Sequence, residues 1–336
     1  MSYSSFKDGY AIETTPGTSV IDGVGDTAYL FGAIFDPAIH PSPTAQVRYT
    51  GTGVNVKEVA ASQLFKARMS LQGFYGMVLQ NGIPIWAAMG ASSTAGSDPY
   101  THTVTPTTDG SDLPSFTINH EQEGTATDEE YQFTGCKIDA LTLVHDLNPD
   151  SPNMLMAQMD WMAMQAQDGI ALTTPPALPP TANSAPYTNL TRTWDYGSGN
   201  LSIDGLKKVS IIIGNGLQPL YAHSYDGGTY TGQWPWRLHE AKRKEYRIVM
   251  EVHPVTVERA IWDELIALSN TKELYFKWTR STNDYIEVTA TDCQVVQHEL
   301  KSTSTNKEEL VEQIVIEPRA LSFSIKDSIA GAQYGE

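Results

Sequence analysis

Short segments in which apolar and polar residues alternate recur along the whole chain, and this period of two constrains the fold more than any other feature. Segments of this kind, rich in Thr, Val, Ile and Tyr, lie at 100–105, 115–118, 285–290 and 321–325. Turn dipeptides such as Asn81-Gly82 and Asn215-Gly216 separate them. Alternation gives each strand one apolar and one polar face. The chain is therefore predicted to be mainly β.

Two segments depart from this period and are predicted to be helical. Between residues 256 and 268, apolar residues recur at helical spacing, and charged residues fill the other faces. The shorter segment 83–90 has Pro84 in the first turn and Gly90 as a stop. We expect small helices beside the sheets.

The segment 172–186 is predicted to be a linker. It carries five prolines and no charged residue. Proline removes backbone donors and stiffens the chain into an extended spacer. The predicted division is a first domain at 1–171 with an N-terminal extension, the linker at 172–186, and a second domain at 187–336.

The same order of landmarks occurs on both sides of the linker, which predicts an internal duplication. Each half has a strand, an Ile-Trp pair, a cysteine and a late acidic residue. These are 66–71, Ile85-Trp86, Cys136 and Asp160 in the first half, and 245–250, Ile261-Trp262, Cys293 and Glu317 in the second. In both halves 24 residues separate the cysteine from the acid. We expect two copies of a β-sandwich or half-barrel unit, each with a small flanking helix.

The charge balance excludes one class of function. The chain has 39 acidic and 22 basic residues, for a net charge of −17. A protein that coats nucleic acid needs an excess of Lys and Arg to displace counterions, so a nucleic-acid coat is excluded. No apolar run approaches the ~20 residues that cross a bilayer. The N-terminus resembles no signal peptide, so cytoplasmic synthesis is expected.

The residues that usually carry chemistry form no recognisable constellation. The eight histidines lack ligand spacing, and no nucleophile elbow, P-loop or dinucleotide fingerprint is present. Cys136 and Cys293 are too few for a disulfide framework and are expected to be buried thiols. We therefore expect no enzyme, with no catalytic, cofactor-binding or metal residues and no cofactor.

Several segments together resemble the tail tube (major tail) proteins of long-tailed phages and related viruses. They are 100–106, 113–118 and 131–143, the short helix at 85–90 and a hairpin at 209–216. The resemblance covers about residues 66–325, and the N-terminal sixty-odd residues have no match. It implies a β-sandwich or half-barrel flanked by a helix, in subunits that form stacked rings. The inner strands of a ring close into one barrel, through which the viral genome passes.

The resemblance also implies the partners. The single-domain members form rings of six, so a chain with two copies is expected to form homotrimeric rings with pseudo-sixfold symmetry. The other expected partners are tail proteins at the tube ends and viral DNA that passes without specific binding; no membrane is involved. The expected location is the virion tail, and the host cytoplasm during assembly.

Two sets of residues are candidates for this function. Asp160 and Glu317 are candidates for lining the channel, where carboxylates would repel DNA phosphates. Candidates for contacts between rings lie in an aromatic and basic stretch: Tyr225, Tyr230, Trp234, Trp236, Arg237, Lys242, Arg243 and Lys244. The basic part is expected to meet the acidic residues between 121 and 130 of a neighbouring chain.

Two other classes of function stay open on the sequence alone. One is a two-domain β-sandwich that binds carbohydrate or protein through the aromatic stretch 225–236. The other is a glycoside hydrolase, whose pair of carboxylates the sequence does not locate.

Overall fold

The structure is a computed structural model that describes most of the chain. The described residues are 6–21, 28–29, 39–49, 57–71, 77–107, 113–122, 129–148, 151, 153–168, 179–183, 185–195, 200–220, 225–226, 229–230, 237–239, 244–253, 272–302 and 310–336. Among them, no helix is long and apolar enough to cross a membrane.

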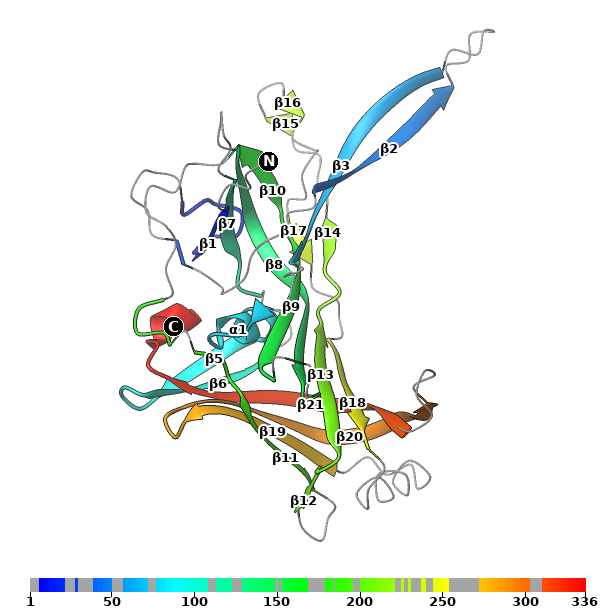
Figure 1. Cartoon of the computed structure of the whole chain (residues 1–336). Helices are drawn as coiled ribbons and strands as arrows, with labels where there is room; N and C mark the ends of the chain where they lie inside the picture. The colour runs from blue at the N-terminus through cyan, green and yellow to red at the C-terminus, as the bar shows by residue number, and fades with distance from the viewer. Residues whose placement is uncertain are drawn as a thin grey trace, which may run out of the picture.

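The described chain is mainly β, as predicted (Figure 1). In the first half the strands are β1 (Phe6–Ile12), β2 (Ile39–Tyr49), β3 (Lys57–Leu71), β4 (Met77–Val78), β5 (Gly90–Ala95), β6 (Tyr100–Pro106), β7 (Phe116–Gln122), β8 (Glu129–Asp146), β9 (Leu155–Met162) and β10 (Gln165–Asp168). In the second half they are β11 (Asn189–Asp195), β12 (Asn200–Ser202), β13 (Leu206–Gly214), β14 (Gln218–Leu220), β15 (Tyr225–Asp226), β16 (Thr229–Tyr230), β17 (Arg237–His239), β18 (Glu245–Val252), β19 (Lys272–Ser281), β20 (Asp284–Ser302) and β21 (Leu310–Asp327). A short 3₁₀ turn, η1 (Gly331–Tyr334), follows.

Seventeen of these strands belong to one antiparallel sheet. Its pairings run in the order β3, β9, β8, β13, β18, β21, β20, β19 and β11. Strand β13 lies between β8 and β18, so the expected hairpin at 209–216 is wrong. The residues form a single central strand because Val209, Ile211 and Ile213 are buried on one face.

The helix predicted at 83–90 is confirmed as α1 (Ile83–Met89). Gly82 occupies its N-cap, Pro84 lies in the first turn, and Gly90 ends it with a φ of 99°, a left-handed conformation that glycine adopts at little cost. All seven helical residues are buried. The second predicted helix, at 256–268, lies outside the described residues.

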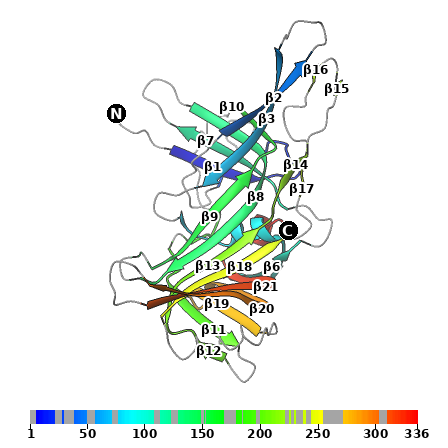
Figure 2. The same cartoon turned by 90° about the vertical axis from the view of Figure 1, so that its right-hand side faces the viewer.

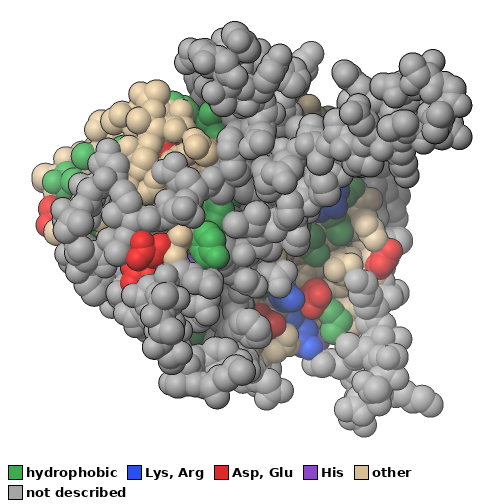
Figure 3. Space-filling model, turned by 90° about the horizontal axis from the view of Figure 1, so that it is seen from above, with side chains coloured by type: hydrophobic (Ala, Val, Ile, Leu, Met, Phe, Trp, Pro, Cys, Tyr) green, Lys and Arg blue, Asp and Glu red, His purple; other side chains and the backbone are tan. Residues whose placement is uncertain are grey.

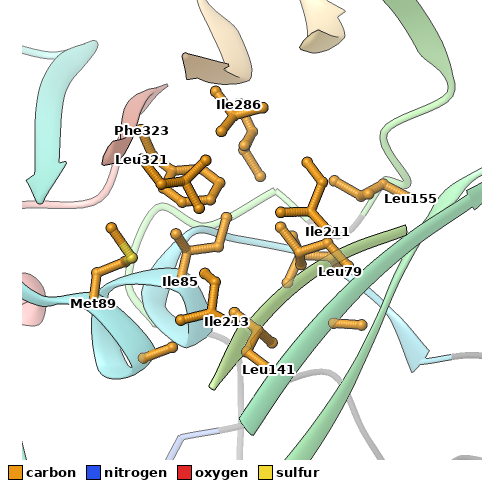
Figure 4. Close-up of a cluster of buried hydrophobic side chains, with 14 of the residues drawn as sticks. Leu79, Ile85, Met89, Leu141, Leu155, Ile211, Ile213, Ile286, Leu321 and Phe323 are labelled. Carbon is orange, nitrogen blue, oxygen red and sulfur yellow. The ribbon is translucent and has the colours of Figure 1, made fainter. Parts of the chain in front are cut away.

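The main core draws on both sides of the predicted linker. Figure 4 shows Ile85 of α1 and Leu141 of β8 among Ile211 of β13, Ile286 of β20 and Phe323 of β21. All five side chains are at most 1% exposed. The two predicted domains therefore share one sheet and one hydrophobic core.

The described part of the linker packs against the second half. The Arg280 guanidinium donates to the Asn183 carbonyl at 2.7 Å, and the Asn183 side chain donates to Asp284 at 3.2 Å. Tyr187, directly after the segment, is fully buried. Residues 179–183 thus lie beside the turn between β19 and β20.

Strands β2 and β3 form a long two-stranded ribbon that projects from the body (Figures 1 and 2). Residues 39–49 pair with 57–67, and only the last residues of β3, 68–71, pair with β9. The small hairpin β15–β16 lies at the same end of the molecule in both views.

Candidate assembly surfaces

Two sets of four strands repeat the same pairing order. Strand β8 lies between β7 and β9, and β9 also pairs with β3. In the second half, β20 lies between β19 and β21, and β21 also pairs with β18. We call β3, β7, β8 and β9 the first repeat and β18, β19, β20 and β21 the second repeat.

The registers around the two cysteines also agree. In the first repeat Cys136 pairs with Phe116, and after a bulge Phe133 pairs with Ile118. In the second repeat Cys293 pairs with Lys272, and after a bulge Ala290 pairs with Leu274. The residue before each cysteine has a positive φ, 65° at Gly135 and 50° at Asp292. Because bulges are specific backbone features, their coincidence supports the duplication more strongly than strand order alone.

A second bulge occurs at matching places, at the third residue beyond each cysteine. Ile138 and Ala140 pair with consecutive residues of β9, which leaves Asp139 bulged. Val295 and Gln297 pair with consecutive residues of β21, which leaves Val296 bulged. Asp139 and Val296 are therefore equivalent positions in the two repeats.

These registers correct the expected equivalence of Asp160 and Glu317. Lys137, next to Cys136, pairs with Met162, whereas Gln294, next to Cys293, pairs with Glu317. Glu317 therefore corresponds to Met162. The equal intervals of 24 residues therefore match Glu317 to the wrong residue, because its counterpart lies two residues, one strand period, beyond Asp160.

The two channel candidates lie in different surroundings. Asp160 is half-buried on the face of β9 that also carries Gln158, opposite the buried side chains of Met159 and Trp161. Glu317 on β21 pairs with Arg247 on β18 at 3.4 Å, with both side chains about half exposed. An ion pair at that exposure adds at most about 1 kcal/mol to stability.

The bulge of the first repeat is covered by the segment after β13. The Asn215 backbone N–H donates to the Asp139 carbonyl, and the Leu217 N–H donates to the Asp139 carboxylate, both at 2.7 Å. The Asn215 side chain donates to the carbonyls of Ile138 and Ala88 at 2.9 and 3.0 Å. Three hydrogen bonds therefore fix this segment to the β8 bulge, and a fourth joins it to α1.

Apolar packing completes the cover on the first repeat. Leu217 and Leu238 are buried with Leu113, and this cluster packs against Met162 and Met164. Met162 and Met164 thus form part of a contact within the chain. Gly135 lies under Met164, because an added Cβ there would lie 2.6 Å from Met164 Cγ.

The equivalent face of the second repeat is an open, charged groove of about 700 Å³. Its lining includes Arg247, Asp292, Gln294, Glu317 and Arg319. Seen from above, the molecule likewise carries acidic and basic side chains close together (Figure 3).

The candidates for contacts between rings fall in three groups. Tyr225 and Tyr230 pair with each other in the β15–β16 hairpin. Arg237 is an exposed residue of β17, whereas Lys244 is half-buried and donates to the Met89 carbonyl at 2.8 Å. Trp234, Trp236, Lys242 and Arg243 lie outside the described residues. Lys244 thus neutralises the carbonyl end of α1 within its own chain.

The expected acidic surface is wrong at one position. Glu121 is only 3% exposed and faces Glu130 across the β7–β8 pair. A buried carboxylate cannot meet a basic loop of another chain without opening the sheet.

The sequence did not predict the β2–β3 ribbon. Pro41 and Pro43 lie inside β2, and proline within a run argues against a strand because it lacks the ladder donor. A two-stranded ribbon tolerates proline, since one edge of each strand needs no ladder partner.

The buried thiols and histidines have structural surroundings. Burial, the larger cause, raises the pKa of the Cys136 thiol well above its usual value and that of Cys293 to about 12. Trp278 Nε1 donates to His145 Nδ1 at 2.9 Å, and burial lowers the pKa of His145. His102 lies between Thr94 and Asp327, stacked on Tyr334. Within the described ranges, no three His, Cys, Asp or Glu residues could hold a metal ion.

Comparison with known proteins assigns the fold to a family of structural proteins. The sequence model described as "Phage tail tube protein" matches residues 9–233, about two thirds of the chain. The chain belongs to the phage tail tube protein family. It is a structural protein of the virion tail, as the resemblance implied.

The chain is also similar to a solved structure over part of its length. The chain described as "Tail of empty GTA particle computed with helical refinement, C6 symmetry" is 15% identical, with a TM-score of 0.27. The match covers 40% of this chain and 94% of that one. No curated protein matches.

Proposed function

We propose that this chain polymerises into stacked rings that form the tail tube, a channel for genome passage during ejection, with three chains in each ring. The observation that supports three chains is the agreement of both bulges and of the strand pairing order between the repeats. Three chains with two repeats each supply six equivalent units to a closed ring. The division at 172–186 then separates two pseudo-equivalent units that share one core.

The wall of the proposed channel is the part of the sheet that runs from β3 through β9, β8, β13, β18 and β21 to β20. Strands of both repeats alternate buried and accessible side chains along this run, so one face packs on the core and the other is available to the lumen. Pairing between β20 of one chain and the next chain's first repeat would close the sheet into a barrel without open edges.

The lumen face proposed here is mainly uncharged, with few charges. Asp160 lies on it with Gln158 of β9 and Thr142 of β8, and Arg247 and Glu251 of β18 lie on the corresponding face further along the sheet. Charges of both signs among neutral side chains leave no strong binding site for phosphate. This supports passage of DNA without specific binding, with Asp160 and Glu317 as lining residues.

The contacts between rings are proposed to come from the end that carries the β2–β3 ribbon and the β15–β16 hairpin (Figure 2). An isolated two-stranded ribbon is marginally stable in water and gains stability from further strands or a packed face. The same end holds Tyr225 and Tyr230, and Arg237 with the basic stretch is proposed to act beside them. Other tail proteins would meet the two tube ends after assembly in the host cytoplasm.

No observation on the described residues favours the carbohydrate-binding module or the hydrolase. The aromatic stretch that would form the platform lies largely outside the described residues. The family is structural, and we propose no catalytic role and no cofactor.

The test of the ring composition is electron cryomicroscopy of tubes assembled from the purified chain. We expect rings of three chains, in which the repeats alternate around the axis and β8 superposes on β20. Rings of six whole chains would contradict the proposal, as would repeats placed at different radii.

The test of the lumen assignment is the ejection rate of particles that carry Asp160→Lys and Glu317→Lys. New lysines in the lumen would attract phosphate and slow ejection more in low salt than in high salt, because salt screens the attraction. If the lysine variants eject DNA at the same rate in low salt as in high salt, the two residues lie outside the channel.

A further inference from the structure

Among the described residues, the second repeat lacks a cover of the kind that the first repeat has. In the first repeat, Lys137 is 1% exposed and Asp139 is half-buried under the segment that carries Asn215 and Leu217. In the second repeat the equivalent residues, Gln294 and Val296, are exposed. Val296 is 42% exposed, one of two large hydrophobic residues on the described surface with that degree of exposure.

The same contrast holds on the neighbouring strand. Met162 and Met164 of the first repeat pack against Leu217 and Leu238. The registers make Glu317 and Arg319 their counterparts, and both are exposed in the charged groove. Asp292, the counterpart of the buried Gly135, is exposed there too.

We infer that a second copy of this chain covers the Val296 bulge and the adjoining side of the groove, at Asp292, Gln294 and Arg319, and leaves Arg247 and Glu317 on the lumen side. This inference rests on the proposed ring. In a closed ring of tandem repeats, each first repeat is followed by the second repeat of its own chain, and each second repeat by the first repeat of the next chain. The cover on β8 comes from the chain's own second half, so the cover on β20 comes from the neighbouring chain.

The chemistry of the groove fits an interface formed after folding. The intrachain contact is apolar, whereas charged side chains of both signs line the groove. The exposed Val296 lies two residues from Gln294 on the same strand. A surface that is exposed in the free subunit and buried in the assembly combines a small apolar centre with a polar rim. Mixed charges fix the register of the partner and disfavour wrong partners.

A photo-crosslinking amino acid at position 296 tests the contact directly. In assembled tubes we expect crosslinks between two chains, mapped by mass spectrometry, and no such product from the unassembled subunit. The matched control is the same amino acid at position 139, which should crosslink within one chain to the residues around Asn215 and Leu217 in both states. Tubes that form normally without interchain crosslinks at 296 would overturn this inference and leave the tube function intact.

A second variant measures the energetic importance of the contact. Val296→Glu should raise the concentration needed for tube assembly about tenfold or more, since it buries a charge at the centre of the interface. Thr103→Glu, at an exposed position of β6, is the control and should assemble as the unaltered chain does. Equal assembly of both variants would overturn the inference. Failure of the unaltered chain to form tubes would overturn the tube function and this inference together.

Discussion

Asp139 and Val296 are the bulged residues at equivalent positions of the two repeats, yet Asp139 binds a covering segment and Val296 is exposed. The Asp139 carboxylate accepts the Leu217 N–H at 2.7 Å, whereas the Val296 side chain is 42% exposed. The two repeats thus share the bulge, and their surfaces diverge. Divergence of this kind is expected where one repeat contacts its own chain and the other contacts a partner.

Substitution of the residue before each cysteine should have opposite effects in the two repeats. Gly135→Ala adds a Cβ 2.6 Å from Met164 and keeps a φ of 65°, so we expect a loss of about 2 kcal/mol or more in the free energy of unfolding. Asp292→Gly removes a side chain from a φ of 50°, so we expect a change between zero and about 1 kcal/mol of stabilisation. Denaturant unfolding of the purified chain measures both.

The control for this pair is Asp292→Ala, which keeps a Cβ in the left-handed conformation. It should be slightly less stable than Asp292→Gly, by about 0.5–1 kcal/mol. A loss at Gly135→Ala no larger than that at Asp292→Ala would show that the contact with Met164 relaxes freely.

Removal of the Asn215 side chain should loosen the cover on the first repeat. Asn215→Ala deletes the donors to the Ile138 and Ala88 carbonyls and leaves both acceptors buried, at a cost of about 2 kcal/mol. Asn215→Asp should cost more, because it places a carboxylate against those carbonyls. Asn283→Ala, which removes an exposed acceptor for Lys326, should change stability by less than about 0.5 kcal/mol. Similar losses at Asn215 and Asn283 would contradict the anchoring role.

Stability should fall when the pH drops below about 6.5, the ordinary pKa of histidine. Burial lowers the pKa of His145, and its Nδ1 accepts a hydrogen bond from Trp278, so the folded state disfavours the protonated ring. The unfolded chain then binds more protons than the folded chain between the lowered pKa and 6.5, and stability decreases as pH falls through that window. Unfolding at pH 8.0 and 5.5 measures the decrease. It should be smaller in His145→Gln, and an equal decrease in that variant would assign the effect to other groups.

Much of the fold follows from the sequence because alternation and capping are local. Strand positions at 100–105, 285–290 and 321–325 match β6, β20 and β21, and Pro84 with Gly90 marks α1. The two cysteines are buried as expected. In contrast, β2 was not predicted, because Pro41 and Pro43 argue against a strand. Among the described strands, β2 pairs only with β3.

The finer assignments depend on register, which alternation does not fix. A shift of two residues along a strand keeps every side chain on the same face, so the interval from cysteine to acid could match while Glu317 corresponds to Met162. The groove has no sequence signal at all. Val296 is exposed because no described segment takes the place there that Leu217 takes on β8, and this is a property of tertiary packing.

The two native cysteines should not react with thiol reagents in the folded chain, whereas a cysteine three residues away should. Cys136 and Cys293 are at most 1% exposed, and burial raises the pKa of Cys293 to about 12, so neither forms the nucleophilic thiolate near pH 8. Val296→Cys places a thiol at a position where 42% of the native side chain is exposed, on the same strand as Cys293. With an aromatic disulfide reagent at pH 8, we expect one fast-reacting thiol in that variant and none in the unaltered chain. Full denaturation should expose three thiols in the variant and two in the unaltered chain.

Reaction of Cys293 at the rate of the new thiol would show that the bulge between β19 and β20 opens in the native state. In assembled tubes the thiol at position 296 should become as slow as the native pair, because the neighbouring chain excludes the reagent from the groove.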